Sequence, residues 1–357
     1  MDGCLARALS GQEANALMST LVRLLLIFCL AFSAGCAARG GEGLFDSDPA
    51  QSIVWPLPPD TPRIRYFRTI TGPEDFRREG RPSRLMRWVV GEGEAELPLR
   101  APYGVTADGE GRVWAADPEA HAVHVFDLAE RQVDYLLTAG EQMLVSPVGV
   151  AYDRERKRLY VSDTGLNQVF VLDRKGRLLG TRAPGEGFSR PAGMALDSSG
   201  QLYVADALAG RIEVFSPEGE HLSGFGEGTL YRPANLAVDP AGQVYVVDSL
   251  NFRIVVFTPE GEVRATIGAI GDGPGSFARP RGVAVDSQGH IYVSDAAFDN
   301  VQIFDMAGNL LLFWGGAGKE PGKFNMPAGL FFDGEDRLYV ADMYNRRIQI
   351  FEYLPQP

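Results

Sequence analysis

The sequence predicts an all-β fold, a β-propeller of six four-stranded blades, and two observations support that prediction. A short pattern that begins with a proline occurs six times, and its prolines recur every 42 to 47 residues. A period of this length, filled with short β-rich segments, is typical of propellers, in which each repeat forms one blade. The repeats begin near Pro102, Pro147, Pro191, Pro233, Pro280 and Pro327.

The second observation is a pair of aspartates at fixed places in every repeat. The first stands six residues after the proline, at Asp108, Asp153, Asp197, Asp239, Asp286 and Asp333. The second follows the next β-rich segment, at Asp117, Asp163, Asp206, Asp248, Asp295 and Asp342. A catalytic site needs one pair of acids, whereas these acids recur at equivalent places in all six repeats. We therefore expect them to have a structural role and to stabilise loops. Three precede an arginine by five residues, which predicts the pairs Asp206–Arg211, Asp248–Arg253 and Asp342–Arg347.

The fifth repeat illustrates the four strands expected in a blade. Apolar or alternating segments at 282–285, 291–293, 301–304 and 310–314 are separated by short loops, as in an antiparallel sheet. An aromatic residue recurs in the second segment of every repeat, and we expect these rings to pack between blades. They are Trp114, Tyr160, Tyr203, Tyr245, Tyr292 and Tyr339.

The sixth repeat ends after its third strand, at 347–351, and lacks a fourth. The alternating segment 63–70, upstream of the first repeat, is the candidate replacement. A strand from the N-terminal side would complete the last blade and remove an exposed sheet edge. We therefore expect one propeller domain over 63–357, with its last blade closed by an N-terminal strand.

The repeats resemble the NHL repeat in their residues as well as their length. The shared pattern is Pro-x-Gly-apolar-Ala-apolar-Asp, then Tyr-Val-x-Asp, then Arg-Ile-x-apolar-Phe, and it covers 102–353. The segments 249–254 and 343–348 match it best, and 273–277 and 320–324 resemble its inter-blade loop. The resemblance implies a six-bladed propeller and leaves the chemistry open, because one fold hosts many functions.

The first 36 residues resemble a bacterial lipoprotein signal peptide. An apolar run over 21–34 follows Met18, an alternative start to Met1, and carries Arg23 near its beginning. It ends in Ser33-Ala34-Gly35-Cys36, which resembles a lipobox and implies lipidation of Cys36. The alternatives are an ordinary secretory signal, cut near Ala34 or Ala37, and an uncleaved membrane anchor.

Residues 37–62 are rich in glycine and proline and are predicted to be a flexible tether. With Ala37 after the cysteine, the resemblance implies an exported lipoprotein, anchored on the periplasmic or cell-surface side of the outer membrane. The segment 83–90 is predicted to form a short amphipathic helix within an arginine-rich stretch. That stretch is either a solvated connection or a docking surface for an anionic partner.

The cysteine content limits the disulfides that the chain can form, and the net charge limits its classes of binding partner. All three cysteines lie within the first 36 residues, so no disulfide can form within the propeller. The chain carries a net charge of −12. Binding to nucleic acid requires a basic surface that engages phosphates, so we expect no nucleic-acid partner.

No catalytic or metal-binding constellation is apparent in the repeats. In the peptidyl-hydroxyglycine amidating lyases, whose propeller this one resembles, zinc-binding histidines follow the repeat proline. That place is filled here by Tyr103, Val148, Ala192, Ala234, Arg281 and Ala328. The calcium site of gluconolactonase-like propellers has no match either. We therefore expect no catalytic residue, no metal and no cofactor. A metal-assisted lyase or lactonase acting in the central channel remains the alternative.

The positions at which the repeats differ are the candidate ligand-binding residues. Asn235 replaces the glycine that the other five repeats place two residues after the proline, and Tyr103 and Arg281 directly follow a proline. Phe252, Phe298 and Tyr344 follow the second aspartate and are expected at the same mouth of the channel. The sequence thus predicts a non-catalytic envelope lipoprotein that binds a protein or peptide; a purely structural envelope component is a further alternative.

Overall fold

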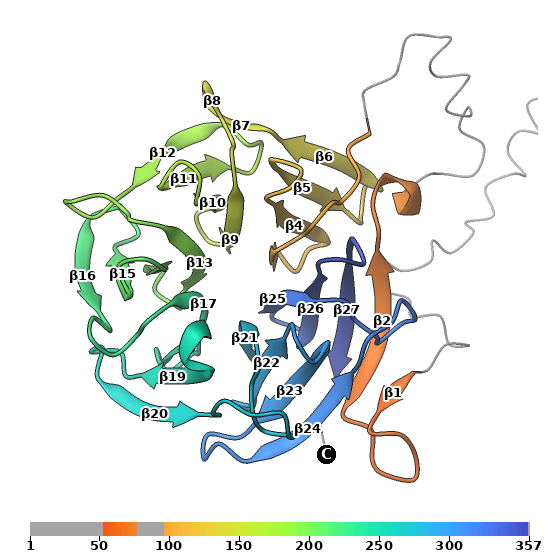
Figure 1. Cartoon of the computed structure of the whole chain (residues 1–357). Coiled ribbons are helices and arrows are strands. Elements are labelled where there is room, and N and C mark those ends of the chain that lie inside the picture. The colour runs from red at the N-terminus through yellow and green to blue at the C-terminus, as the bar shows by residue number, and fades with distance from the viewer. Residues whose placement is uncertain (1–52, 77–95, 356–357) are drawn as a thin grey trace, which may run out of the picture. The chain divides into compact units, whose positions relative to one another are not determined.

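The computed structural model describes residues 53–76 and 96–355. The predicted signal peptide with Cys36, the first part of the tether and the predicted helix at 83–90 lie outside these residues. The described part is an all-β, six-bladed propeller, as predicted, with its six sheets arranged around a central axis (Figure 1). Two short 3₁₀ segments, η2 (Pro73–Phe76) and η3 (Ser249–Asn251), accompany the strands. Within the described ranges, no helix is long and apolar enough to cross a membrane.

Each blade is an antiparallel sheet whose first strand lies at the axis and whose fourth lies at the outside (Figure 1). Blade one consists of β3 (Gly104–Ala107), β4 (Arg112–Asp117), β5 (Ala122–Asp127) and β6 (Gln132–Leu136). Blade two consists of β9 (Pro147–Asp153), β10 (Arg158–Asp163), β11 (Gln168–Asp173) and β12 (Leu178–Arg182). A small hairpin, β7 (Thr138–Ala139) and β8 (Gln142–Met143), lies between them. Blade three consists of β13 (Pro191–Leu196), β14 (Leu202–Asp206), β15 (Arg211–Phe215) and β16 (His221–Phe225). Blade four consists of β17 (Pro233–Val238), β18 (Val244–Asp248), β19 (Arg253–Phe257) and β20 (Val263–Ile267).

Blade five, which consists of β21 (Pro280–Val285), β22 (Ile291–Asp295), β23 (Asn300–Phe304) and β24 (Leu310–Gly315), follows the sequence prediction closely. Blade six contains β25 (Pro327–Phe332), β26 (Arg337–Asp342) and β27 (Arg347–Tyr353) from the end of the chain. Its fourth strand is β2 (Ile64–Ile70), which pairs antiparallel with β27 from Ile64 opposite Tyr353 to Ile70 opposite Ile348. The N-terminal strand therefore closes the ring, as expected.

Blade six has one strand more than the sequence predicts. β1 (Val54–Trp55) pairs with β2 on its outer edge. The Trp55 ring lies 6.3 Å from the Trp314 ring and 5.9 Å from the Phe351 ring, centroid to centroid. Residues from 53 onward, assigned to the tether from their prolines, therefore belong to the propeller, because the indole packs on blade six.

The second aspartate of each repeat is buried and connects its blade to the loop before it. Asp206 accepts hydrogen bonds from the backbone N–H of Ser189 at 2.7 Å and of Arg190 at 2.8 Å. The five equivalent residues likewise accept a backbone N–H from the loop just before the proline of their own repeat: Asp117, Asp163, Asp248, Asp295 and Asp342. A carboxylate that satisfies buried N–H donors stabilises the loop, which confirms a structural role for these acids.

Two of the three predicted arginine pairs form. Arg253 Nε lies 3.1 Å from Asp248 Oδ2, and Arg347 Nε lies 2.7 Å from Asp342 Oδ2. The pair Asp206–Arg211 is wrong, because Arg211 Nε contacts Glu213 Oε1 at 2.6 Å instead. Glu213 stands two residues further along β15, on the same face of the strand, and its carboxylate is available to the guanidinium.

The first aspartate of each repeat stabilises the turn after the innermost strand, and in four repeats it also accepts the tyrosine hydroxyl. The tyrosine Oη lies 2.9 Å from the carboxylate for Tyr245 and Asp239, and 3.0 Å for Tyr339 and Asp333. The rings are buried, as predicted for residues that pack between blades. Burial, together with the neighbouring carboxylate, raises the pKa of Tyr203 to about 12 and also raises the pKa values of Tyr245, Tyr292 and Tyr339.

These tyrosines predict that the protein loses stability in alkali. In the unfolded chain a tyrosine ionises near its ordinary pKa of about 10, whereas Tyr203 in the folded protein, with its raised pKa, stays protonated until about pH 12. A pKa raised by folding contributes stability that is complete below the unfolded pKa and is lost as pH rises towards the folded one. We expect the free energy of unfolding, measured by urea titration, to fall between about pH 10 and pH 12. An unchanged value across that range would contradict the buried Tyr–Asp contacts.

Glycines two residues after the proline allow the innermost strands to approach one another. A Cβ at Gly149 would lie 2.3 Å from the Ala192 carbonyl oxygen, and one at Gly282 would lie 2.3 Å from that of Ala328. Because these distances are far below contact, backbone packs directly on backbone between neighbouring blades. The six innermost strands are thereby held close around one narrow channel.

Candidate functional site: the central channel and its mouth

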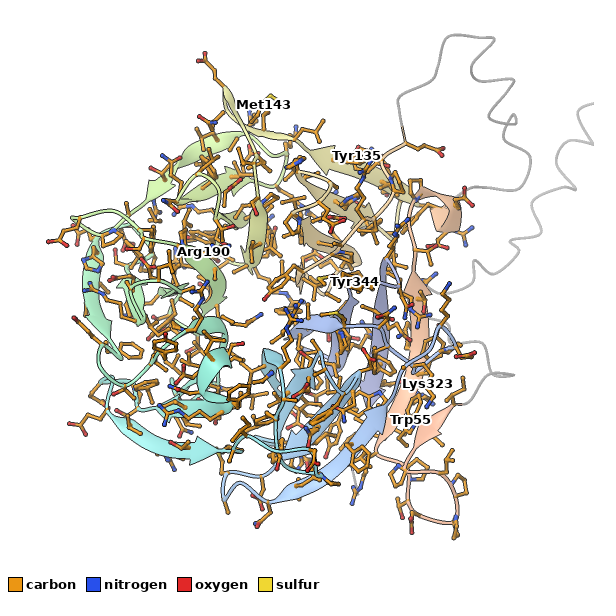
Figure 2. All side chains as sticks on the ribbon, viewed as in Figure 1. Trp55, Tyr135, Met143, Arg190, Lys323 and Tyr344 are labelled. Carbon is orange, nitrogen blue, oxygen red and sulfur yellow. The ribbon has the colours of Figure 1, made fainter. Side chains whose placement is uncertain are left out.

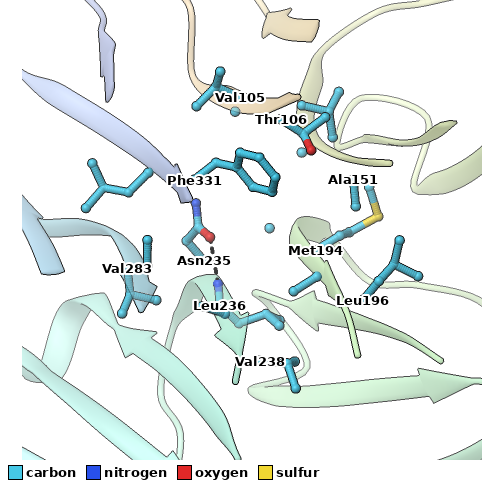
Figure 3. Close-up of a pocket in the computed structure, with 18 of the residues that line it drawn as sticks. Val105, Thr106, Ala151, Met194, Leu196, Asn235, Leu236, Val238, Val283 and Phe331 are labelled. Carbon is cyan, nitrogen blue, oxygen red and sulfur yellow. Dashed lines mark hydrogen bonds between the residues drawn. The ribbon is translucent and has the colours of Figure 1, made fainter. Parts of the chain in front are cut away.

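The channel along the axis is a cavity of about 240 Å³ whose walls combine apolar side chains with backbone groups of the strands. All six innermost strands, β3, β9, β13, β17, β21 and β25, contribute to its lining. The side chains are chiefly aliphatic or aromatic, among them Met194, Leu196, Leu236, Val283 and Phe331 (Figure 3). A concave cavity that combines apolar side chains with polar groups is a common form of small-ligand site.

Three lining residues, Thr106, Tyr152 and Asn235, carry polar groups in their side chains, and two of them stand on β3 and β17. Thr106, on β3, is 1% exposed, and its Oγ1 has no hydrogen-bond partner among the described residues. Asn235, on β17, accepts a hydrogen bond at Oδ1 from the Leu236 N–H at 2.7 Å, and its Nδ2 donates to no residue that the structure describes. Blades one and four face each other in a ring of six, so the two groups lie on opposite walls (Figure 3).

Arg281 and Tyr103 form the rim of the channel on the face where the repeats begin. The Arg281 Cζ lies over the Tyr103 ring, 5.6 Å from its centroid, and Nη1 lies 3.3 Å from the Met343 Sδ. β25 lies between β21 and β3 in the ring, and its residue at the matching position is the fully buried Ala328. The small alanine leaves room for the arginine to extend across blade six to blade one.

The charge of Arg281 is partly buried without an acid beside it. Burial holds the pKa of this guanidinium below its usual value, and the charge of Arg279 acts in the same direction. An arginine nevertheless stays protonated at any physiological pH. Among residues 53–76 and 96–355 no carboxylate forms an ion pair with it. The phenol groups of Tyr103 and Tyr344 act on the pKa of this guanidinium in the opposite direction.

Three further arginines stand on this face, each directly before a repeat proline: Arg190, Arg232 and Arg279. None forms an ion pair within the described residues. The second aspartate of the same repeat accepts the backbone N–H of each of them, as Asp206 does for Arg190. In Figure 2, Arg190 and Tyr344 lie on opposite sides of the central opening. The inner part of this face is therefore positively charged although the whole chain is acidic.

The structure brings together only some of the residues that the sequence proposed for the mouth. Tyr103 and Arg281 are in contact, Tyr344 is 54% exposed beside them, and Asn235 lines the channel itself. Phe252 adopts a left-handed conformation, φ 55°, and packs against the hydrophobic cluster between blades four and five. Phe298 is half-buried in the β22–β23 loop, where its backbone N–H donates to Asp295 Oδ1 at 3.3 Å.

Sequence reasoning missed Thr106, Met343 and the arginines before the prolines. An arginine at the same place in three of six repeats was a visible signal, since loops vary freely unless they have a role. The contacts of Met343 and Thr106 left no such signal, because they depend on which side chain of another blade reaches them.

The remaining titratable clusters form pairs. His124 and Asp117 are both fully buried, with 3.6 Å between Nε2 and Oδ2. His221 Nε2 lies 2.7 Å from Glu213 Oε2, and His290 Nδ1 lies 2.8 Å from Asp286 Oδ2. Within the described ranges, no group of three or more histidines, cysteines or acids is placed to hold a metal ion.

Comparison with known proteins identifies relatives of the repeats. A family model described as a 6-bladed beta-propeller matches residues 234–311, and one described as an SMP-30/gluconolactonase/LRE-like region matches 136–228. NHL repeat-containing protein 2 of Bos taurus is 27% identical over 159 residues, which are 35% of this chain and 22% of that protein. The Gallus gallus protein is 28% identical over 143 residues, so the chain matches about a fifth of each relative's length.

Solved structures share the fold at low sequence identity. Virginiamycin B lyase from Staphylococcus aureus aligns over 71% of this chain and 95% of its own, with a TM-score of 0.54 and 14% identity. An auxiliary nutrient binding protein from Bacteroides thetaiotaomicron aligns over 71% of this chain and 69% of its own, with a TM-score of 0.54 and 15% identity. The chain thus resembles NHL-type six-bladed propellers in sequence and in fold.

Proposed function

Starting from a propeller that resembles the NHL-repeat proteins, we propose that this protein is a non-catalytic binding module whose channel mouth holds a protein or peptide. The observation that supports the proposal is the mouth itself. It combines a guanidinium and two phenol rings on a rigid ring of blades, beside a cavity lined by apolar side chains and backbone groups. Arginine and tyrosine are the side chains that most often dominate binding energy at protein interfaces.

We further propose that the module works in the cell envelope, exported and attached to a membrane by a lipid on Cys36. The lipobox-like Ser33-Ala34-Gly35-Cys36 at the end of an apolar run supports this location. The substitution Cys36→Ser should abolish incorporation of radiolabelled palmitate and should move the protein from the membrane fraction to the soluble fraction. Labelling that persists in the Cys36→Ser protein would exclude this residue as the anchor.

The binding function predicts that mouth substitutions remove the ligand without unfolding the ring. We expect the wild-type protein to capture a defined envelope protein or peptide, and Tyr103→Ala and Arg281→Met to reduce its capture by about tenfold or more. Phe313→Ala is the matched control, because Phe313 is a 50% exposed aromatic residue on the outer strand β24. Quantitative mass spectrometry of cross-linked eluates provides the measurement. Equal recovery with all four proteins would contradict binding at the mouth.

The alternative function is a metal-assisted lyase or lactonase that acts in the channel. The match of residues 136–228 to a gluconolactonase-like family favours it. This alternative requires about one tightly held metal ion per chain. Elemental analysis of protein purified without chelators decides between the two: a stoichiometric metal supports the enzyme, and its absence supports the binding module.

A further inference from the structure

We propose that the ligand of this mouth presents a carboxylate to Arg281 and places an apolar group in the channel beneath it. This inference rests on the proposed binding function and specifies the chemistry of the ligand. The ligand class is an amphipathic carboxylic acid, which is either a free hydrophobic acid or the C-terminus of a peptide that ends in an apolar residue.

The charge of Arg281 is the first argument. A buried or partly buried charge is costly unless an opposite charge pairs with it. Two other partly buried arginines have such a partner: Arg112 pairs with Asp127 at 2.7 Å, and Arg253 pairs with Asp248 at 3.1 Å. No described carboxylate contacts the guanidinium of Arg281. An anionic ligand would supply the missing partner.

The donors of Arg281 are the second argument. A guanidinium carries five N–H donors arranged as a planar fork that matches a carboxylate. Among the described residues, this side chain donates one hydrogen bond, from Nη1 to the weak acceptor Met343 Sδ. The Tyr103 ring holds the guanidinium by its face and uses none of its donors. The fork is therefore positioned while most of its donors stay available.

The channel is the third argument. Its lining begins at Gly104, the residue after Tyr103, and includes Val283, two residues after Arg281. The guanidinium therefore stands at the same end of the innermost strands as this part of the cavity of about 240 Å³, whose side chains are mostly apolar. A hydrophobic group that enters this cavity leaves water, which favours binding in proportion to the apolar area buried.

Asn235 adds a second polar contact at the entrance. It stands at the top of β17, the strand next to β21, at the position where the other repeats have glycine. Its Oδ1 is engaged by the Leu236 N–H, which fixes the amide in the channel and leaves Nδ2 without a described acceptor. This donor suits a carboxylate oxygen or the last peptide carbonyl of the ligand. Arg190, Arg232 and Arg279 supply a positive field that attracts an anion to the opening.

The test measures binding of four probes to the full-length protein by calorimetry. The probes are phenylacetate, phenylacetamide, the peptide Ala-Ala-Phe with a free C-terminus, and the same peptide amidated. We expect each acid to bind about tenfold or more tightly than its amide, because a charged hydrogen-bond pair is lost in the amide. The two acids should compete with each other. Binding of phenylacetate alone would indicate that the ligand is a free hydrophobic acid, and binding of the free peptide alone would indicate a peptide C-terminus. Either result supports the inference.

Variants connect the effect to the mouth. Arg281→Met should weaken binding of the acids by about 10- to 100-fold, and Arg281→Lys should weaken it less. Arg264→Met, on the exposed outer strand β20, removes the same charge and should leave affinity unchanged. Thermal unfolding of each variant confirms that the ring is intact.

Three outcomes would overturn the inference. Equal affinity for the acid and amide probes would show that the mouth does not recognise a carboxylate, while peptide binding would remain as the proposed function. An Arg281→Met protein that is folded and binds the acids like the wild type would place the site elsewhere. Absence of binding by all four probes, in a protein that still captures its envelope partner through Tyr103, would exclude this ligand class while the proposed function stands.

Discussion

A protein that lacks residues 53–70 is expected not to fold to a stable monomer. Without β2, blade six ends at β27 and exposes a full row of unpaired backbone groups together with the hydrophobic residues that β2 covers. Ile64 and Ile70 of β2 are 0% and 1% exposed, so both sides of the seam lose buried surface. We expect aggregation on expression, and recovery of soluble protein when a peptide of residues 53–70 is added during refolding.

A point substitution tests the same seam in a protein that still folds. Ile64→Ala should lower the free energy of unfolding by about 2–5 kcal/mol, because it leaves a cavity in a packed core. Leu311→Ala is the matched control, since Leu311 is 50% exposed on the outer strand β24 and should cost little. Urea denaturation followed by tryptophan fluorescence measures both. A loss for Ile64→Ala no larger than that for Leu311→Ala would show that β2 adds little to the ring.

Asp342→Ala is expected to destabilise the propeller by about 3–5 kcal/mol, the typical cost of leaving a buried charge without its partner. Asp342 accepts hydrogen bonds from Arg347, Asn345 and Gln349 side chains and from the Asn325 N–H. Arg347 is 8% exposed, so its guanidinium would lose its only carboxylate within the described residues.

The repeats supply the control for this prediction. Asp206→Ala, at the matching place in blade three, removes the backbone contacts with Ser189 and Arg190, but Arg211 there keeps Glu213 as its partner. We expect a smaller loss of about 1–3 kcal/mol. The double variant Asp342→Ala, Arg347→Met should regain part of the stability, because it leaves no orphaned charge. Equal losses at Asp342 and Asp206, measured by thermal unfolding, would contradict a special role for the Arg347 pair.

The fold could be predicted because each repeat specifies its own blade locally. Proline, the two aspartates and the recurring aromatic act within one blade or between neighbours, so their spacing alone indicates the ring. The closing strand followed from counting, since a sixth repeat with three strands needs a fourth. β1 could not be predicted, because its position depends on the packing of Trp55 against Trp314 and Phe351, far along the chain.

The location of the candidate site could be predicted from the sequence, but only some of its residues could be. Departures from the repeat pattern indicated Tyr103, Arg281 and Asn235, which the structure places at or in the channel. Phe252 could not be placed from sequence, because its left-handed backbone turns the ring into the packing of blades four and five. The Arg281–Tyr103 contact arises only when blades five and one meet around blade six, which no local pattern encodes.

The pairing of β2 with β27 also sets the order in which the molecule can be completed. Arg65 donates to Glu352 across 287 positions of sequence, and the first described strands are made long before their partners exist. Blades one to five contain all of their own strands and can form as the chain is synthesised. Joining distant segments carries a loop-closure cost that only the finished seam repays. The ring consequently closes only after residues 347–353 have been synthesised, because β27 is the strand that joins β2 to the rest of blade six.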